Sequence, residues 1–133
     1  MLTLDALSKT YADGNRALDR IGLTLRTGEI VALIGGSGCG KTTLLRLVAG
    51  LDRATAGAAS LDGETILDPH PAVGIVFQEP RLLPWLDVAA NVGFGLQDLP
   101  AAERRERVAH ALDKVGLSAH AGRWPRELSG GQQ

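Results

Sequence analysis

The sequence predicts an α/β fold, and three observations support this prediction. Residues 29–34 form a short, partly β-branched apolar run, which is typical of a buried strand. A glycine-rich loop follows at residues 35–40, and apolar residues then recur at helical spacing up to Gly50, a plausible helix stop. A second continuous apolar run, at residues 73–77, is predicted as a buried parallel strand.

Further strands are expected on either side of the glycine-rich loop. Residues 2–7 and 18–26 alternate apolar and polar side chains, which predicts two strands with one buried face each. Residues 54–59 are small and are expected to be weakly structured. Residues 59–67 then predict a short hairpin that turns at Asp62-Gly63.

Two helices are expected in the second half of the chain. Asp87 is a favourable N-cap for a helix that runs to about Leu96. Residues 101–115 form the clearest amphipathic helix, and its charged residues 103–107 are interpreted as a solvated face. Its predicted apolar face comprises Val108, Ala111, Leu112 and Val115.

The composition limits the possible functions. A chain of 133 residues with 44% hydrophobic residues makes one domain at most. A net charge of −1 without a basic stripe disfavours nucleic acid as a partner. The sequence shows neither a secretory signal nor an apolar run long enough to cross a bilayer. A single cysteine suits a reducing compartment.

The glycine-rich loop matches the phosphate-binding pattern G-x-x-x-x-G-K-[ST] at every fixed position. The matching segment comprises Gly35, Gly36, Ser37, Gly38, Cys39, Gly40, Lys41, Thr42 and Thr43. Its glycines allow successive N–H groups to face an anion, and the following helix adds the positive end of its dipole. Lys41 supplies a mobile positive charge, and the Thr42 hydroxyl is a suitable Mg²⁺ ligand. The alternative, a glycine-rich turn that contains a lysine by chance, is disfavoured by the flanking strand and helix.

Two further features lie downstream of this loop. Gln78 directly follows the apolar run at residues 73–77, where α/β folds collect ligands. A second glycine-containing motif comprises Leu128, Ser129, Gly130, Gly131 and Gln132. It offers a serine N-cap and two glycines that can approach a phosphate closely, although Ser-Gly-Gly is also a common flexible turn.

With these three motifs in this order, the chain resembles the ATP-binding subunits of ABC transporters. They correspond to the family's Walker A loop, its Q-loop glutamine and its LSGGQ signature. The resemblance implies a P-loop NTPase fold with an antiparallel β subdomain, a RecA-like parallel sheet and a helical subdomain at about residues 86–133. Residues 1–133 would form the N-terminal part of one such domain, incomplete at the C-terminus. Tyr11 lies where the family has its adenine-stacking aromatic residue.

The family resemblance also implies cofactors and partners. ATP and Mg²⁺ would bind at the loop, with Thr42 and Gln78 near the metal and with Lys41 and Gln78 in catalytic roles. The signature of one copy would contact the ATP of a second copy in a homodimer. The segment Leu82 to Trp85 would face membrane permease subunits at the cytoplasmic face of the membrane. A solute-binding protein would be an indirect partner.

Smaller features suggest a subgroup. Residues 77–85, 91–96 and 123–128 are similar to importers of aliphatic sulfonates, nitrate or taurine, and most similar to the aliphatic sulfonate group. Three other classes of protein carry a similar phosphate loop or fit the chain as given. An ABC-type ATPase of DNA repair or chromosome organisation usually carries long insertions, and a P-loop kinase or GTPase does not explain residues 128–132. A nucleotide-binding module without catalysis is the third alternative.

We expect this polypeptide to show little or no ATPase activity. The sequence ends at Gln133, and the family's Walker B aspartate and catalytic glutamate, which position the metal and the hydrolytic water, would follow later. A phosphate-release assay measures this directly. Turnover that is abolished by Lys41→Ala would contradict the expectation.

We also expect the isolated chain to be poorly stable or to aggregate. Without further central strands, the apolar runs around Val31 and Val73 would lack neighbours and would expose apolar faces. Thermal unfolding followed by circular dichroism tests this. A sharp two-state transition would show that the expectation is wrong.

Overall fold

The computed structural model describes residues 1–133, which divide into two compact units, Met1–Val76 and Phe77–Gln133. The first unit contains β1 (Leu2–Thr10), β2 (Arg16–Leu25), α1 (Lys41–Val48), β3 (Ala56–Leu61) and β4 (Glu64–Thr65). The second unit contains α2 (Val88–Val92), the 3₁₀ turn η1 (Phe94–Leu96), α3 (Ala101–Lys114), η2 (Ser118–His120) and η3 (Pro125–Glu127). None of these helices combines the length and the hydropathy needed to cross a bilayer.

The strands form one antiparallel sheet in the order β2-β1-β3-β4. The two predicted N-terminal strands and the hairpin at Asp62-Gly63 are confirmed. The expectation of weak structure at residues 54–59 is wrong from Ala56 onward, because β3 begins there. Backbone pairing with β1 stabilises this strand, and small side chains do not prevent such pairing.

A bulge in β1 places its leucines in the core. Leu4 pairs with Leu23, whereas Leu7 pairs with Ile21, so β1 has one extra residue between these pairs. The backbone of Ala6 has a positive φ of 43° at this position. Strict alternation would bury Leu4 and residue 6. The bulge instead buries Leu4 and Leu7, which are 3% and 1% exposed.

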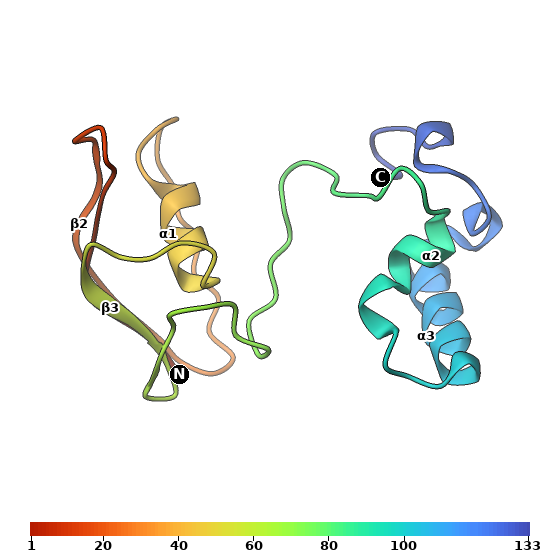
Figure 1. Ribbon diagram of the computed structural model, residues 1–133, viewed down its shortest axis with the longest axis horizontal. Coiled ribbons are helices and arrows are strands. Elements are labelled where there is room, and N and C mark those ends of the chain that lie inside the picture. Colours follow the sequence, from red (N-terminus) through yellow and green to blue (C-terminus); the bar gives the residue numbers. More distant parts are fainter. The chain divides into compact units, whose positions relative to one another are not determined.

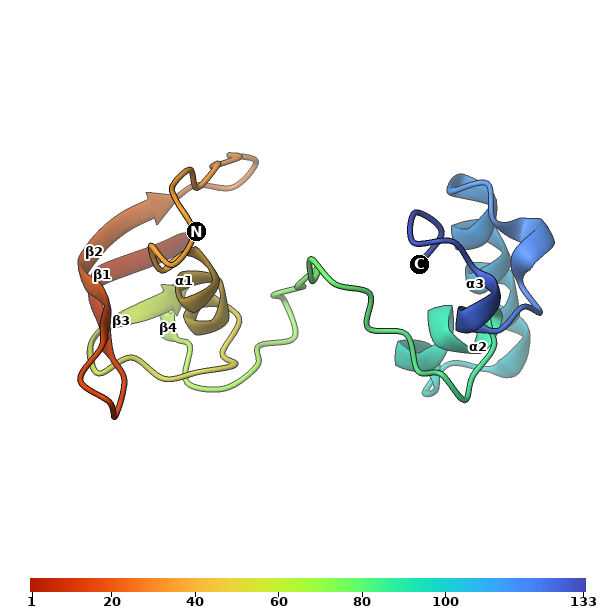
Figure 2. The same cartoon turned by 90° about the horizontal axis from the view of Figure 1, so that it is seen from above.

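Helix α1 packs along one face of the sheet (Figures 1 and 2). Its apolar residues recur at the predicted helical spacing, and Gly50 follows the helix with a positive φ of 69°. The buried core between helix and sheet comprises Leu4, Leu7, Leu18, Leu44, Leu47, Ala59 and Ile66. This packing fixes the position of the loop that directly precedes α1.

The second unit is helical, and its α2 begins as predicted. The Asp87 side chain accepts a hydrogen bond of 2.7 Å from the Ala90 N–H group. The regular helix ends at Val92, and η1 covers the remaining residues to Leu96. The buried core of this unit comprises Val88, Val108, Leu112 and Leu128.

The predicted apolar face of the amphipathic helix is partly wrong. In α3 only Val108 and Leu112 are buried, whereas Ala111 is exposed and Val115 is 66% exposed. Residues at positions i and i+4 share one narrow stripe of a helix. In this unit α3 contributes only Val108 and Leu112, which lie on one such stripe, to the buried core.

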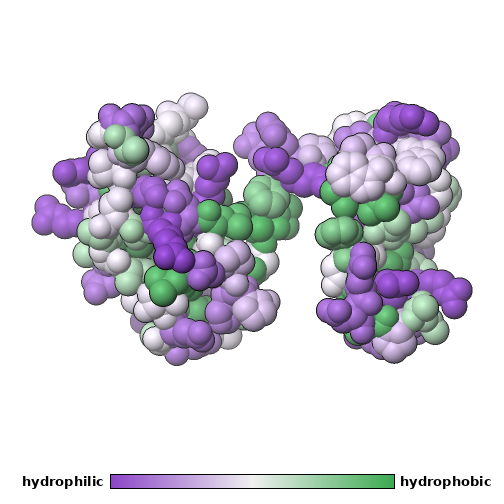
Figure 3. All heavy atoms as spheres, in the orientation of Figure 1, coloured by the Kyte–Doolittle hydropathy of each residue, from purple (hydrophilic) through white to green (hydrophobic).

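The predicted parallel strands at residues 29–34 and 73–77 are wrong for this structure. Neither segment is a strand, and Ile30, Ile34 and Val76 are 94%, 95% and 98% exposed. Hydrophobic spheres accordingly lie open at the surface in the space-filling view (Figure 3). A parallel strand obtains its hydrogen bonds from neighbouring strands, and the only sheet here is antiparallel. The antiparallel and helical parts of the expected fold are therefore present, and the parallel sheet is not formed.

We predict that Gly40→Ala loosens α1. Gly40 has a φ of 95°, and a Cβ atom there would lie 2.5 Å from the Ala17 carbonyl oxygen. A non-glycine residue strained in this way costs about 1–3 kcal/mol. Hydrogen-exchange mass spectrometry should show faster exchange of the α1 amides. Gly22→Ala is the control, because a Cβ atom at Gly22 meets nothing within 4 Å; equal exchange in both variants would refute the prediction.

Candidate functional site

The Lys41 side chain lies across the glycine-rich loop. Its ammonium group donates hydrogen bonds to the carbonyl oxygens of Gly35 (2.8 Å) and Gly36 (2.7 Å). The same nitrogen lies 3.4 Å from Cys39 Sγ. Loop residues 35–39 are all exposed, so this charge is accessible from solvent. An anion that enters the loop can take the place of the two neutral carbonyl groups and form stronger, charge-assisted hydrogen bonds.

The start of α1 adds further positive character to the loop. No side chain caps the helix at Gly40, and its first turn contains no acidic residue. The first N–H groups of a helix have no partner within the helix, and the helix dipole is positive at this end. Thr42 is exposed in this first turn. The loop and the helix end together form a surface that suits phosphate oxygens.

Tyr11 is connected to the phosphate loop through Thr43. The tyrosine directly follows β1, and its hydroxyl group lies 3.0 Å from Thr43 Oγ1. Thr43 is 9% exposed in the first turn of α1. An aromatic ring is therefore fixed beside the loop that is predicted to hold phosphates.

The other predicted site residues lie in the second unit. Gln78 is exposed in an irregular segment, and the neighbouring Phe77 ring lies 5.2 Å from the Arg81 guanidinium carbon. The structure places Tyr11 and residues 35–43 together in the first unit, and it places Gln78 and residues 128–132 in the second. The roles predicted for these residues remain predictions.

The motif at residues 128–132 is anchored at one end and open at the other. Leu128 is 9% exposed within the core of the second unit. The Ser129 carbonyl oxygen accepts a hydrogen bond of 2.9 Å from the Gln132 N–H group, and the Gln132 side chain accepts one of 3.0 Å from the Ser129 N–H group. These two contacts close a turn over residues 129–132, in which the Gln132 side chain reaches back to the Ser129 backbone. Gly130 and Gly131 are exposed between them.

Two residues beside Tyr11, Lys9 and Asp52, are not among the predicted site residues. The Lys9 ammonium group lies 5.2 Å from the centre of the Tyr11 ring and 2.5 Å from Asp52 Oδ1. Tyr11 lies beyond the last residue of β1, and the pairing of β1 with β2 is irregular between Lys9 and Thr10, so alternation along the strand does not predict this contact. The contact with Asp52 could not be predicted either, because Asp52 lies 43 positions after Lys9 in the sequence.

Comparison with known proteins gives one matching family and similar curated relatives. The family model described as "ABC transporter" matches residues 18–133. An aliphatic sulfonates import ATP-binding protein, SsuB 1 of Xanthomonas axonopodis pv. citri, is 55% identical over 120 residues, which is 88% of this chain and 48% of the relative. The methionine import ATP-binding protein MetN of Caulobacter vibrioides is 44% identical, over the whole of this chain and 43% of its own length. The chain thus spans about half the length of the curated relatives it matches.

A solved structure supports the same assignment. The ATP-binding cassette MJ0796, described as dimeric in a post-hydrolysis state bound to ADP and Pi, aligns with a TM-score of 0.87 and 32% sequence identity. The alignment covers 99% of this chain and 65% of the solved chain. The fold is therefore that of an ABC-type ATPase cassette, of which this chain forms part. The family match, the relatives and the fold agree, and the chain belongs to the ABC transporter family.

Proposed function

We propose that this chain binds MgATP through the phosphate loop, as part of the ATP-binding subunit of an importer. The observation that carries the proposal is the Lys41 ammonium group, which lies in an exposed loop against two neutral carbonyl oxygens. The uncapped end of α1 adds a second favourable environment for phosphate. The curated relatives above are ATP-binding proteins of import systems, which agrees with this chemistry.

Each predicted site residue then has a defined role. Lys41 would contact the β- and γ-phosphates, the amides of residues 36–43 would surround them, and Tyr11 would stack on the base. Thr42 and Gln78 would hold Mg²⁺, since hydroxyl and amide oxygens are the hard ligands that this ion accepts. The ion would neutralise charge on the phosphate oxygens. Gln78 would also orient the attacking water when the complete enzyme hydrolyses ATP.

A second copy would complete the site. Residues 129–131 of that copy would approach the open side of the phosphates and enclose the nucleotide in the dimer interface. The geometry of the motif supports this role: Leu128 is anchored in the core, and Gly130 and Gly131 are exposed with no side chain to block a phosphate. The related cassette bound to ADP and Pi is described as dimeric. ATP binding would then favour association of the two copies.

The second unit would contact the membrane permease through an exposed apolar segment. The segment Leu82 to Trp85 is apolar, and Trp85 is 67% exposed. Asn91 orders this segment, because its side chain exchanges hydrogen bonds of 2.7 and 3.1 Å with the backbone of Leu83 and donates another, of 3.0 Å, to the Leu86 carbonyl oxygen. An exposed tryptophan on a well-ordered loop is a typical anchor at a protein interface. The subunit would therefore bind at the cytoplasmic face of the membrane.

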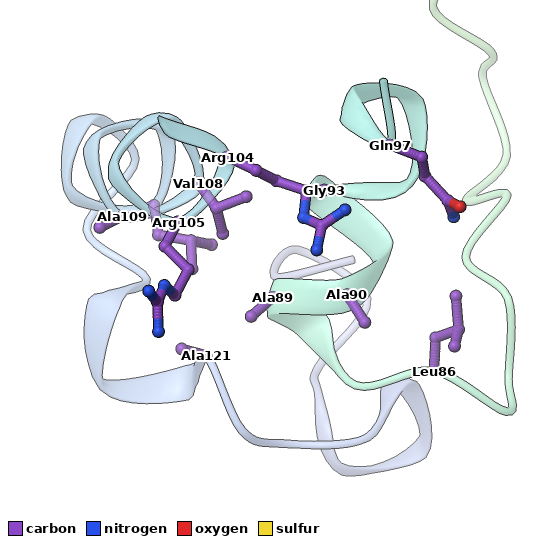
Figure 4. A pocket seen from close by; sticks show the side chains of 11 residues that line it. Leu86, Ala89, Ala90, Gly93, Gln97, Arg104, Arg105, Val108, Ala109 and Ala121 are labelled. Carbon is purple, nitrogen blue, oxygen red and sulfur yellow. The ribbon is translucent and has the colours of Figure 1, made fainter. Parts of the chain in front are cut away.

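A groove between α2 and α3 lies beside this segment. It has a volume of about 510 Å³, and it is mainly apolar with two arginines among its lining residues (Figure 4). Its lining includes Leu86, Ala89, Gly93, Arg104, Arg105 and Val108. The groove would extend the permease contact from Leu86 onto the two helices.

We propose aliphatic sulfonates, or a similar small anion, as the transported solute. Relatives named for sulfonate import are 47–55% identical to this chain. Relatives named for methionine and for spermidine/putrescine import are 44% and 46% identical to this chain. Sulfonates are therefore favoured over these solutes by sequence similarity alone. A solute-binding protein would deliver the solute to the permease.

The binding experiment compares Lys41→Ala with Lys114→Ala on the full chain. We expect Lys41→Ala to weaken MgATP binding by about tenfold or more, because a hydrogen bond to a charged group contributes roughly 1.5–3 kcal/mol. Lys114 lies at the end of α3 in the second unit and serves as the matched charge control. Isothermal titration calorimetry measures both. Equal affinities in the two variants would overturn the proposal.

A further inference from the structure

We propose that Lys9 is a positioning residue for nucleoside recognition, which holds the Tyr11 ring for a base on its opposite face. The inference rests on the proposed function, since it concerns the base end of the same nucleotide site. It is carried by one cluster in the first unit. The cluster comprises Lys9, Tyr11, Thr43, Asp52 and Arg53.

The Tyr11 ring is held at its edge and through its backbone. Its hydroxyl group is hydrogen-bonded to Thr43 at 3.0 Å. Its backbone N–H group donates to the Asn15 carbonyl oxygen (2.9 Å), and its carbonyl oxygen accepts from the Gly14 N–H group (3.0 Å). These contacts restrain the position of the residue. They leave open which face of the ring a ligand would meet.

Lys9 occupies one face of that ring. Its side chain is only 12% exposed, and its ammonium group lies 5.2 Å from the ring centre. Two acceptors fix the ammonium group in place: Asp52 Oδ1 at 2.5 Å and the Arg53 carbonyl oxygen at 2.7 Å. A lysine side chain held in this way does not sample other rotamers freely, so the covered face stays covered.

The acidic partner of Lys9 is itself fixed. Asp52 Oδ1 also accepts a hydrogen bond of 2.7 Å from the Arg53 N–H group. The hydrogen bond from Lys9 is the main factor that lowers the pKa of the Asp52 carboxyl group, and the nearby Arg46 charge acts in the same direction. Asp52 is therefore ionised at neutral pH, and the Lys9–Asp52 ion pair persists beside the ring.

Two consequences for a ligand follow. A base can stack only on the ring face away from Lys9. A cation over one face also draws electron density toward itself, which favours an electron-rich purine on the other face. Lys9 would thus act on the base through Tyr11, without touching the phosphates.

The experiment compares affinities for MgATP and for magnesium tripolyphosphate, which has the phosphates but no base. We expect Lys9→Met to weaken MgATP binding by about threefold to tenfold, the range of a partly desolvated cation–π contact. Its affinity for magnesium tripolyphosphate should be unchanged. Lys9→Arg should restore most of the MgATP affinity, because a guanidinium group can hold the same acceptors and cover the same face. Isothermal titration calorimetry on the full chain provides these values.

Three further variants make the result decisive. Arg26→Met removes an exposed charge just after β2 and should match the unsubstituted chain with both ligands. Tyr11→Phe removes only the bond to Thr43 and should weaken MgATP binding selectively. Equal losses of both ligands in Lys9→Met, or a loss in Tyr11→Ala with none in Lys9→Met, would overturn the role of Lys9 and leave the proposed function intact. If Tyr11→Ala leaves MgATP binding unaltered, the base site itself is misplaced.

Discussion

The packing of α1 against the antiparallel sheet is the constraint on which the nucleotide site depends. Leu44 and Leu47 of the helix share one buried core with Leu4, Leu7 and Leu18 of β1 and β2. This core fixes the start of the helix, and the start of the helix fixes the glycine-rich loop. The bulge in β1 is part of the same arrangement, because it brings Leu7 to the helix and sets the direction in which the strand continues to Lys9 and Tyr11.

The glycine-rich loop at residues 35–40 carries the accessible charge of Lys41, and no acidic side chain competes with a ligand for that charge. In the structure the Lys41 ammonium group is satisfied by neutral carbonyl oxygens, which are weaker partners than phosphate oxygens. The buried Thr43, in contrast, faces the sheet and contacts Tyr11. The two neighbouring threonines in the first turn of α1 therefore have different surroundings: Thr42 is exposed to solvent, whereas Thr43 is buried and bonded to Tyr11.

The second unit carries features of a different kind. It has a compact core around Val88, Val108 and Leu112, and around that core it exposes a tryptophan, a mainly apolar groove and the glycines of the signature. These are features of surfaces that bind other molecules rather than of a self-contained domain. They agree with the proposed contacts to a second copy and to a permease.

By itself the sequence determined the local features: the phosphate loop, the helices that begin near Lys41 and Asp87, the hairpin at Asp62-Gly63 and the family. Each depends on residues close together in the chain, such as a cap, a turn or a periodic pattern. That residues 29–34 and 73–77 do not form strands is visible only in the folded chain, because a strand depends on neighbours that its own sequence does not specify. The same holds for the contact of Lys9 with Asp52, which lie 43 positions apart in the sequence and meet only in the folded chain.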